Sequence, residues 1–368
     1  MTIVGMTSVR LHSPAELVAL LPYTIGFRPR RSVVLVGLRN RVLGVVQRID
    51  TTDDPGFIGE ICEVLVTNLQ RDRCHAAVIV GYEDRAGESA ELACALGAAV
   101  TAAGLRLVDE VVVQDGCVRR PGEPFAVAVT VPADHRVPAV ATFVGLGRSP
   151  AADRETLASR VRPADTPLRA AVARAIAQRG RGGARGPRAA AAVGWWAAYL
   201  DWTAYPAGGG ATVAAVEMAR LIVSLRDRRM RDLVIAWLCP GCPPMRLMDS
   251  HLVAMATATF RSRVAPEDPE IRGWLTERLC VLVDHCPDAD APAVLSVLAA
   301  FAWYEGRGAL ASIAVERALE LDPDYRLARL LERMIRYGIR SRPADGDGES
   351  EGESGVRHDG APMAGGAA

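Results

Sequence analysis

Short apolar runs and segments with helical apolar spacing follow one another over the first 150 residues of the chain. Short β-branched and apolar runs, bounded by turn residues, predict strands at 32–38, 42–49, 76–81, 105–113 and 125–131. Only two polar residues separate the first two runs, which therefore form a predicted hairpin. Helical spacing predicts helices at 14–21, 57–69 and 87–103, the first ending in a turn at Pro22. After that first helix, the order ββαβαββ predicts a mixed α/β sheet with helices packed on it.

From about residue 151 the apolar spacing becomes helical. We predict helices at 153–161, 166–178, 190–205, 211–225, 227–238, 245–261, 269–285, 292–305, 309–321 and 324–337. The Gly/Arg-rich stretch 179–188 lacks large apolar residues and is a predicted linker. The resulting division is an α/β domain over 1–165, a helix plus linker over 166–190, an all-α helical domain over 191–338 and a disordered acidic tail over 339–368.

All 43 basic residues are arginines, and 43 acidic residues balance them, so the formal net charge is zero. The absence of lysine excludes P-loop nucleotidases, pyridoxal enzymes, protein kinases and SxxK serine enzymes, because each requires that side chain. The sequence also lacks the motifs HExxH, GxSxG and GxGxxG, and its six histidines are scattered. We therefore expect no cofactor.

The first ten residues lack the charged start and apolar run of a signal peptide. The most membrane-like run, 189–200, is shorter than the roughly 20 apolar residues that a spanning helix needs. We therefore expect a cytoplasmic protein without a membrane segment, whose eight cysteines are reduced.

Two groups of charged residues are candidate ligand-binding residues. Glu83 and Asp84 leave the carboxyl end of a predicted buried strand, where open α/β sheets place their ligand sites. Such a pair could bind a divalent cation, act in acid–base chemistry, or simply complement the dipole of the following helix. The other candidates are Arg28, Arg30 and Arg31, a cationic loop suited to phosphate or carboxylate, and Asp50, which ends the hairpin.

The cysteines at Cys239 and Cys242 have the spacing of a redox pair or of half a zinc site. His285 and Cys286 are the candidates that could complete a zinc shell, although they do not form a second CxxC. The alternative is a tight turn with two ordinary thiols. We predict no metal, because a single CxxC with an irregular partner is a weak zinc signal. We do not expect redox chemistry either, because a thioredoxin-like pair opens a helix, whereas Cys239 follows one.

The predicted linker at 179–188 could contact phosphate through its arginines. Nucleic-acid binding is not expected, because the aromatic and base-reading groups that usually accompany such charge are absent from this stretch. A solvated hinge is the alternative interpretation.

Several stretches of the sequence carry a family resemblance. They are LHSPAEL from Leu11, PYTIGFRPRRSVV from Pro22, RID ending at Asp50, GLGRSP from Gly145 and RETLA from Arg154. Together they resemble the actinobacterial domain of unknown function 4192, over about 11–335. The resemblance implies a family without implying an activity.

A second resemblance concerns the helices near the end of the chain. The segment 291–323 is similar to one tetratricopeptide unit, with small residues at Ala311 and Ala318 where its helices would pack closely. A tetratricopeptide-like array would imply a concave surface for a protein partner, whereas a plain helical bundle is the alternative.

These patterns lead to two hypotheses. The first is a non-enzymatic adaptor or regulatory protein, whose α/β domain senses or positions something and whose helical domain binds a protein partner. The second is a hydrolase or nucleotide-binding enzyme that uses Glu83, Asp84 and the arginine loop. The second hypothesis predicts a well-formed cleft beside Asp84.

Overall fold

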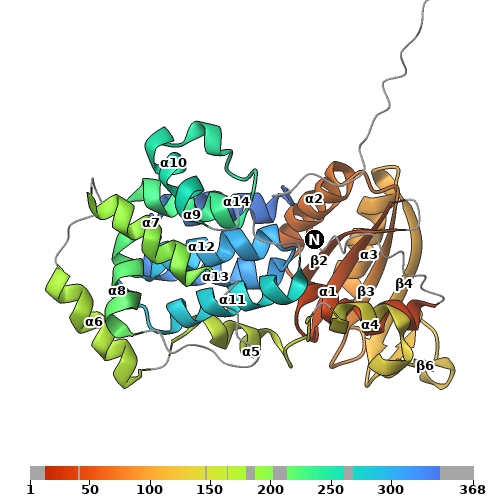
Figure 1. Ribbon diagram of the computed structural model, residues 1–368. Coiled ribbons are helices and arrows are strands. Elements are labelled where there is room, and N and C mark those ends of the chain that lie inside the picture. The colour runs from red at the N-terminus through yellow and green to blue at the C-terminus, as the bar shows by residue number, and fades with distance from the viewer. Residues whose placement is uncertain are drawn as a thin grey trace, which may run out of the picture.

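The computed structural model (Figure 1) describes residues 13–39, 42–145, 147–163, 165–179, 187–201, 214–260 and 268–339. The amino-terminal residues form a mixed sheet with helices packed on it, and the rest of the described chain is mainly helical. The predicted fold class, α/β followed by all-α, is therefore confirmed. Most of the predicted linker at 179–188 and of the predicted tail at 339–368 lies outside the described residues. The domain boundaries stay predictions.

The strands lie in the order β2, β1, β3, β4, β5, β6. Their bounds are β1 (Ser32–Arg39), β2 (Val42–Asp50), β3 (Ala76–Tyr82), β4 (Arg106–Gln114), β5 (Cys117–Arg119) and β6 (Val129–Thr130). β3 and β4 are parallel, and the other neighbouring pairs are antiparallel. Every residue of β3 is buried, as expected for a central strand that reads as one unbroken apolar run.

Helices cover both faces of this sheet. They are α1 (Pro14–Ile25), α2 (Pro55–Arg71) and α3 (Ala90–Ala102), and α4 (Pro138–Gly145) packs against α1. Val33 and Leu35 of β1 join the core formed with α2 and α3, whereas Val34 and Val36 point the other way into the core formed with α1. This alternation follows from the two-residue period of a strand. Helices α2 and α3 therefore lie on one face of the sheet and α1 on the other.

The chain does not turn at Pro22, contrary to the prediction. Helix α1 continues to Ile25 and ends at Gly26, whose φ of 100° is the left-handed conformation of a glycine cap. The amide of Gly26 donates to the carbonyl of Pro22 at 2.7 Å. Leu20 and Leu21 are buried on both sides of the helix, so packing holds the proline within it.

Two other predicted elements differ from the structure. The run at 125–131 forms a 3-10 turn (Phe125–Val127) and the two-residue β6, because it lies at the open edge of the sheet where its apolar side chains stay exposed. The helix predicted at 245–261 starts only at Ser250, where the Asp249 carboxylate accepts hydrogen bonds from the first free amides. Strand β5 and helix α4 were not predicted.

The helical part follows α4. Its helices are α5 (Arg154–Ala158), α6 (Pro167–Arg179), α7 (Pro187–Tyr199), α8 (Ala215–Ser224), α9 (Arg228–Leu238), α10 (Ser250–Thr259), α11 (Pro269–Asp284), α12 (Ala291–Tyr304), α13 (Gly308–Leu321) and α14 (Arg326–Arg336). One continuous apolar core joins them, with Trp196 and Phe301 fully buried. Helix α12 is buried on nearly all sides, as expected of a central helix that is apolar all round.

Helices α12 and α13 pack against each other across a short turn. Gly306 takes a φ of 70°, and the amide of Arg307 donates to the carbonyl of Ala302 at 2.7 Å. This is the hydrogen bond of a glycine-capped helix end. Ala311 and Ala318 are fully buried. The tetratricopeptide resemblance of this pair stays a prediction.

The end of the helical part is tied to the sheet part through α2. The buried amide of Asn68 donates to Gln47 Oε1 at 2.8 Å and to the carbonyl of Arg336 at 3.0 Å. Arg71 donates to the carbonyl of Tyr337. Helix α2 therefore binds the otherwise unpaired carbonyls at the carboxyl end of α14.

We expect Asn68→Ala to lower the free energy of unfolding by about 2 kcal/mol, because it leaves buried acceptors without a donor. Urea denaturation followed by circular dichroism measures the change. Gln70→Ala is the matched control, since Gln70 lies exposed on the same helix. Equal stability of the two variants would show that this junction does not hold the parts together.

Candidate functional site

The arginine loop and the acidic pair predicted as site residues meet at one edge of the sheet. Glu83 and Asp84 follow the carboxyl end of β3, and β1 runs antiparallel to β3 with Ser32 paired to Tyr82. The loop before β1 therefore lies beside the two acids. Arg30 donates to both carboxylate oxygens of Asp84, at 2.9 Å from Nη2 and 3.4 Å from Nε.

The other two arginines of the loop pair with different acids. Arg31 Nε lies 3.6 Å from Glu88 Oε1, and Arg28 Nη2 lies 3.1 Å from Asp134 Oδ2. All three arginine side chains are more than half exposed, so each pair is expected to contribute less than about 1 kcal/mol. Each arginine of the loop already has a carboxylate partner.

Asp50 lies at the same edge of the sheet, opposite Ser32 on the neighbouring strand. Its carboxylate pairs with Arg48, whose guanidinium also lies 5.6 Å from the centre of the Phe27 ring. The predicted ligand-binding residues are thus gathered at one edge of the sheet. There each of the three arginines pairs with an acid, and Asp50 and Asp84 each pair with an arginine.

Glu83 differs from these surface residues, because its side chain is only 1% exposed. Its carboxylate accepts hydrogen bonds from the Gly87 amide at 2.9 Å, the Ser89 amide at 3.1 Å and the Ser89 hydroxyl at 2.7 Å. Arg119 Nη2 lies 4.0 Å away. Glu83 therefore binds the loop that leads into α3 and places a negative charge at the start of that helix.

Gly81 allows this arrangement. A Cβ built at this position would lie 2.9 Å from the Cβ of Ser89, closer than real side chains approach. A glycine at position 81 thus lets the start of α3 approach β3 closely enough for Ser89 to reach Glu83.

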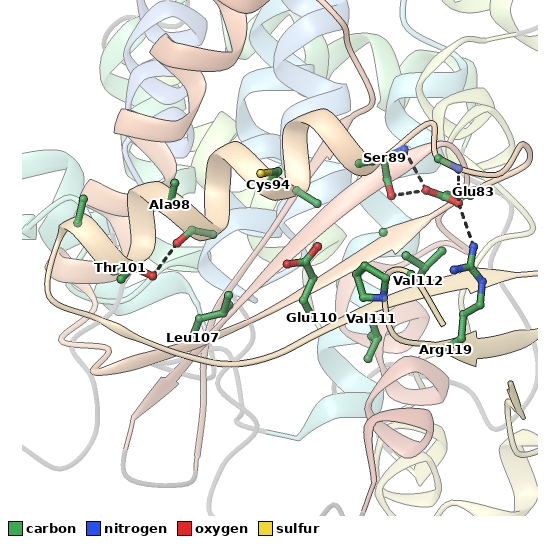
Figure 2. Close-up of a pocket in the computed structure, with 18 residues that line it drawn as sticks. Glu83, Ser89, Cys94, Ala98, Thr101, Leu107, Glu110, Val111, Val112 and Arg119 are labelled. Carbon is green, nitrogen blue, oxygen red and sulfur yellow. Dashed lines mark hydrogen bonds and ion pairs between the residues drawn. The ribbon is translucent and has the colours of Figure 1, made fainter. Parts of the chain in front are cut away.

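A groove with a volume of about 900 Å³ runs along α3, between that helix and the strands β4 and β5. Figure 2 shows its lining residues. The helix contributes small side chains, including Ala93, Gly97 and Ala98, and the strands contribute Leu107 and Val111. Because these side chains of α3 are small, they leave room for the groove, whose surface is mainly apolar. Asp84 is not among its lining residues, although Glu83 is.

Glu110 points from β4 toward α3 inside this groove (Figure 2). A Cβ at Gly97 would lie 3.9 Å from its Oε2 atom, so the carboxylate lies against the middle of the helix. Burial raises the pKa of Glu110. No described residue donates a hydrogen bond or forms an ion pair with this carboxylate. This partly buried carboxylate is therefore a hydrogen-bond acceptor that a ligand could use.

Two further ionisable groups line the groove. Arg119 of β5 lies at the Glu83 end, and Cys94 presents an exposed thiol from α3. Glu110, Arg119 and Cys94 were not predicted as site residues from the sequence. One signal was available for Glu110, because the acidic pair Asp109 and Glu110 interrupts the apolar residues of the strand predicted at 105–113.

The zinc and redox candidates lie in the helical part. Cys239 is buried at the end of α9, and burial raises the pKa of its thiol well above the ordinary value. Cys286 behaves likewise. Within the described residues, no group of three or more His, Cys, Asp or Glu side chains could hold a metal ion, so His285 and Cys242 do not complete such a site there. A raised thiol pKa disfavours the thiolate that redox exchange needs.

The protein is a mixed α/β fold followed by a helical part, and its groove lies in the α/β part. This chain belongs to the family described as Domain of unknown function (DUF4192), whose family model matches residues 14–342. No curated protein and no solved structure matches the chain. Among the described helices, none is both long and apolar enough to span a bilayer.

Proposed function

We propose that this protein is a non-enzymatic regulatory protein that binds a small amine in the groove along α3. One observation carries the proposal: the Glu110 carboxylate points into an open groove and has no partner among the described residues. Carboxylates removed from bulk water bind best to a cationic donor. A ligand ammonium group would supply one.

The charges and the shape of the groove support a cation with an apolar body. Its ionisable lining side chains are Glu83, Glu110, Arg119 and the Cys94 thiol, so the carboxylates outnumber the guanidinium by one. The small apolar residues of α3 suit an alkyl or ring portion of the ligand. The expected ligand is therefore a compact molecule with an amine at one end.

Binding is favoured over catalysis by the state of the acidic pair. The Glu83 carboxylate holds the loop before α3, and Asp84 is bound by Arg30. Acid–base chemistry with these two groups would require both to leave their partners. The protein partner predicted for the helical part stays a prediction, as does its role as an adaptor.

Alkylation of Cys94 offers a direct test, because this exposed thiol lines the groove. We expect n-hexylamine to slow the reaction of Cys94 with iodoacetamide, measured by mass spectrometry of its peptide, and hexanoate to have no effect. Alkylation at Cys117 and Cys242, followed in the same digest, controls for changes in the reagent. Equal protection by the acid and the amine would contradict the proposal.

Glu110→Gln should weaken n-hexylamine binding about tenfold, the loss expected for one charged hydrogen bond. Glu91→Gln, on an exposed carboxylate of α3 outside the groove, should leave the amine affinity unchanged.

The amine needs an ionised carboxylate, and burial raises the pKa of Glu110. The affinity for the amine should therefore fall on acidification at a higher pH than it would for an exposed glutamate. Protection measured from pH 7.5 to 5 tests this sign, and Glu110→Gln should abolish the pH dependence.

A further inference from the structure

A second group of charged side chains lies far from the α3 groove in the sequence. Arg148, in the segment after α4, donates from Nη2 to the backbone carbonyl of Glu305 at 3.0 Å. Arg272 of α11 places Nη1 3.1 Å from the Glu305 carboxylate. Arg307 follows in the turn between α12 and α13. Three arginines and one glutamate therefore meet where the chain after α4 contacts the helical part.

The positive charge of this cluster exceeds its negative charge. Three guanidinium groups against one carboxylate give a net charge of +2. Among the described residues, neither Arg148 nor Arg307 has a carboxylate within 4.0 Å, and the buried Nε atom of Arg307 has no acceptor. Glu277, a second carboxylate that attracts Arg307 electrostatically, forms an ion pair with Arg160.

The cluster is also partly shielded from bulk water. The Arg272 side chain is 14% exposed, and Arg148 and Arg307 are partly buried. Burial lowers the pKa of Arg148 to about 10, and repulsion from Arg307 adds to the shift. Burial lowers the pKa of Arg307 as well. Desolvated positive charges that repel each other are unfavourable in the folded protein unless an anion compensates them.

The start of α13 adds a further positive contribution. Arg307 is its N-cap residue, and no side chain caps the helix there. The first amides of a helix carry the positive end of its dipole and are unpaired within the helix. The positive end of the α13 dipole therefore begins at the backbone of Arg307 itself.

We infer that the cluster of Arg148, Arg272 and Arg307 binds the phosphate group of a small molecule. Guanidinium groups donate parallel hydrogen bonds that match the oxygens of a phosphate, and two of them remain available here. Because these side chains are only partly buried, solvent can reach them. This site is separate from the proposed amine site, and neither inference depends on the other.

Titration calorimetry of the full chain with inorganic phosphate and with glycerol 3-phosphate tests the inference, in Hepes buffer with chloride at constant ionic strength. We expect binding that Arg307→Gln and Arg148→Gln each weaken about tenfold to hundredfold. Arg329→Gln is the control, because Arg329 is 62% exposed and pairs with an exposed acid elsewhere. Equal affinities would indicate a site for the phosphate group alone, and tighter binding of the ester a site for a phosphorylated metabolite.

Thermal unfolding separates a binding role from a structural one. Without phosphate, Arg307→Gln should be about as stable as the unmodified protein, because it removes both the repulsion of Arg148 and the attraction of Glu305. With phosphate at 10 mM, only the unmodified protein and Arg329→Gln should gain stability. Absence of binding by both anions, or equal binding by all variants, would overturn the inference. Lower stability of Arg307→Gln in both buffers would assign the arginine a structural role instead.

Discussion

Glu83→Ala is expected to lower the free energy of unfolding by about 3–5 kcal/mol, because it removes a buried carboxylate that accepts hydrogen bonds from the start of α3. The side chain is 1% exposed and accepts three hydrogen bonds. Removing it leaves two amides and one hydroxyl without an acceptor, and leaves Arg119 without its nearby carboxylate. Urea denaturation followed by circular dichroism measures the loss.

Two variants show whether the hydrogen bonds cause this loss. Glu83→Gln keeps the shape and one acceptor oxygen, so we expect a smaller loss of about 1–2 kcal/mol. Glu91→Ala removes an exposed acid from the first turn of the same helix, where only the helix dipole is affected, and should cost less than about 1 kcal/mol. If Glu83→Ala were as stable as Glu91→Ala, the carboxylate would not be holding α3, and Glu83 would return as a candidate catalytic acid.

Trp196→Ala is expected to lower the free energy of unfolding by about 3–5 kcal/mol through the cavity it leaves. Trp196 is fully buried, its indole donates to Ser224 Oγ at 2.9 Å, and its ring meets Tyr199 edge-on at 5.9 Å. The same denaturation experiment measures the effect.

The neighbouring tryptophan provides the comparison. Trp195 is only partly buried and lies beside the guanidinium of Arg220, 5.3 Å from its ring centre. Trp195→Ala should therefore cost about 1 kcal/mol or less. Similar losses for the two substitutions would contradict the packing of α7 described here.

Most of the fold could be predicted because its signals are local. The β-branched apolar runs of β1 and β2 and the helical period of α2 are set by residues close together in the sequence. Strand β5 has only three residues and α4 only eight, so neither gives a long periodic signal. Pro22 misled the prediction because tertiary packing of α1 outweighs the local preference of proline.

The candidate site was less predictable. The sequence placed Glu83, Asp84 and the arginine loop near a strand end. It could not show that each arginine of the loop pairs with an acid, or that Glu83 binds the start of α3. The groove depends on α3, β4 and β5 lying side by side, and its space comes from side chains that are small rather than from a motif. The arginine cluster likewise joins residues 157 positions apart, from Arg148 to Glu305.

Metabolite capture tests the proposed amine site most directly. The purified protein is equilibrated with a small-molecule extract of its source cells, and retained compounds are identified by mass spectrometry. Ala98→Trp should fill the groove from an exposed position on α3, whereas Glu91→Trp adds the same bulk outside it. We expect an amine-bearing metabolite to be retained by the unmodified protein and by Glu91→Trp, and lost from Ala98→Trp. Identical retention by all three proteins would contradict a ligand site in the groove along α3.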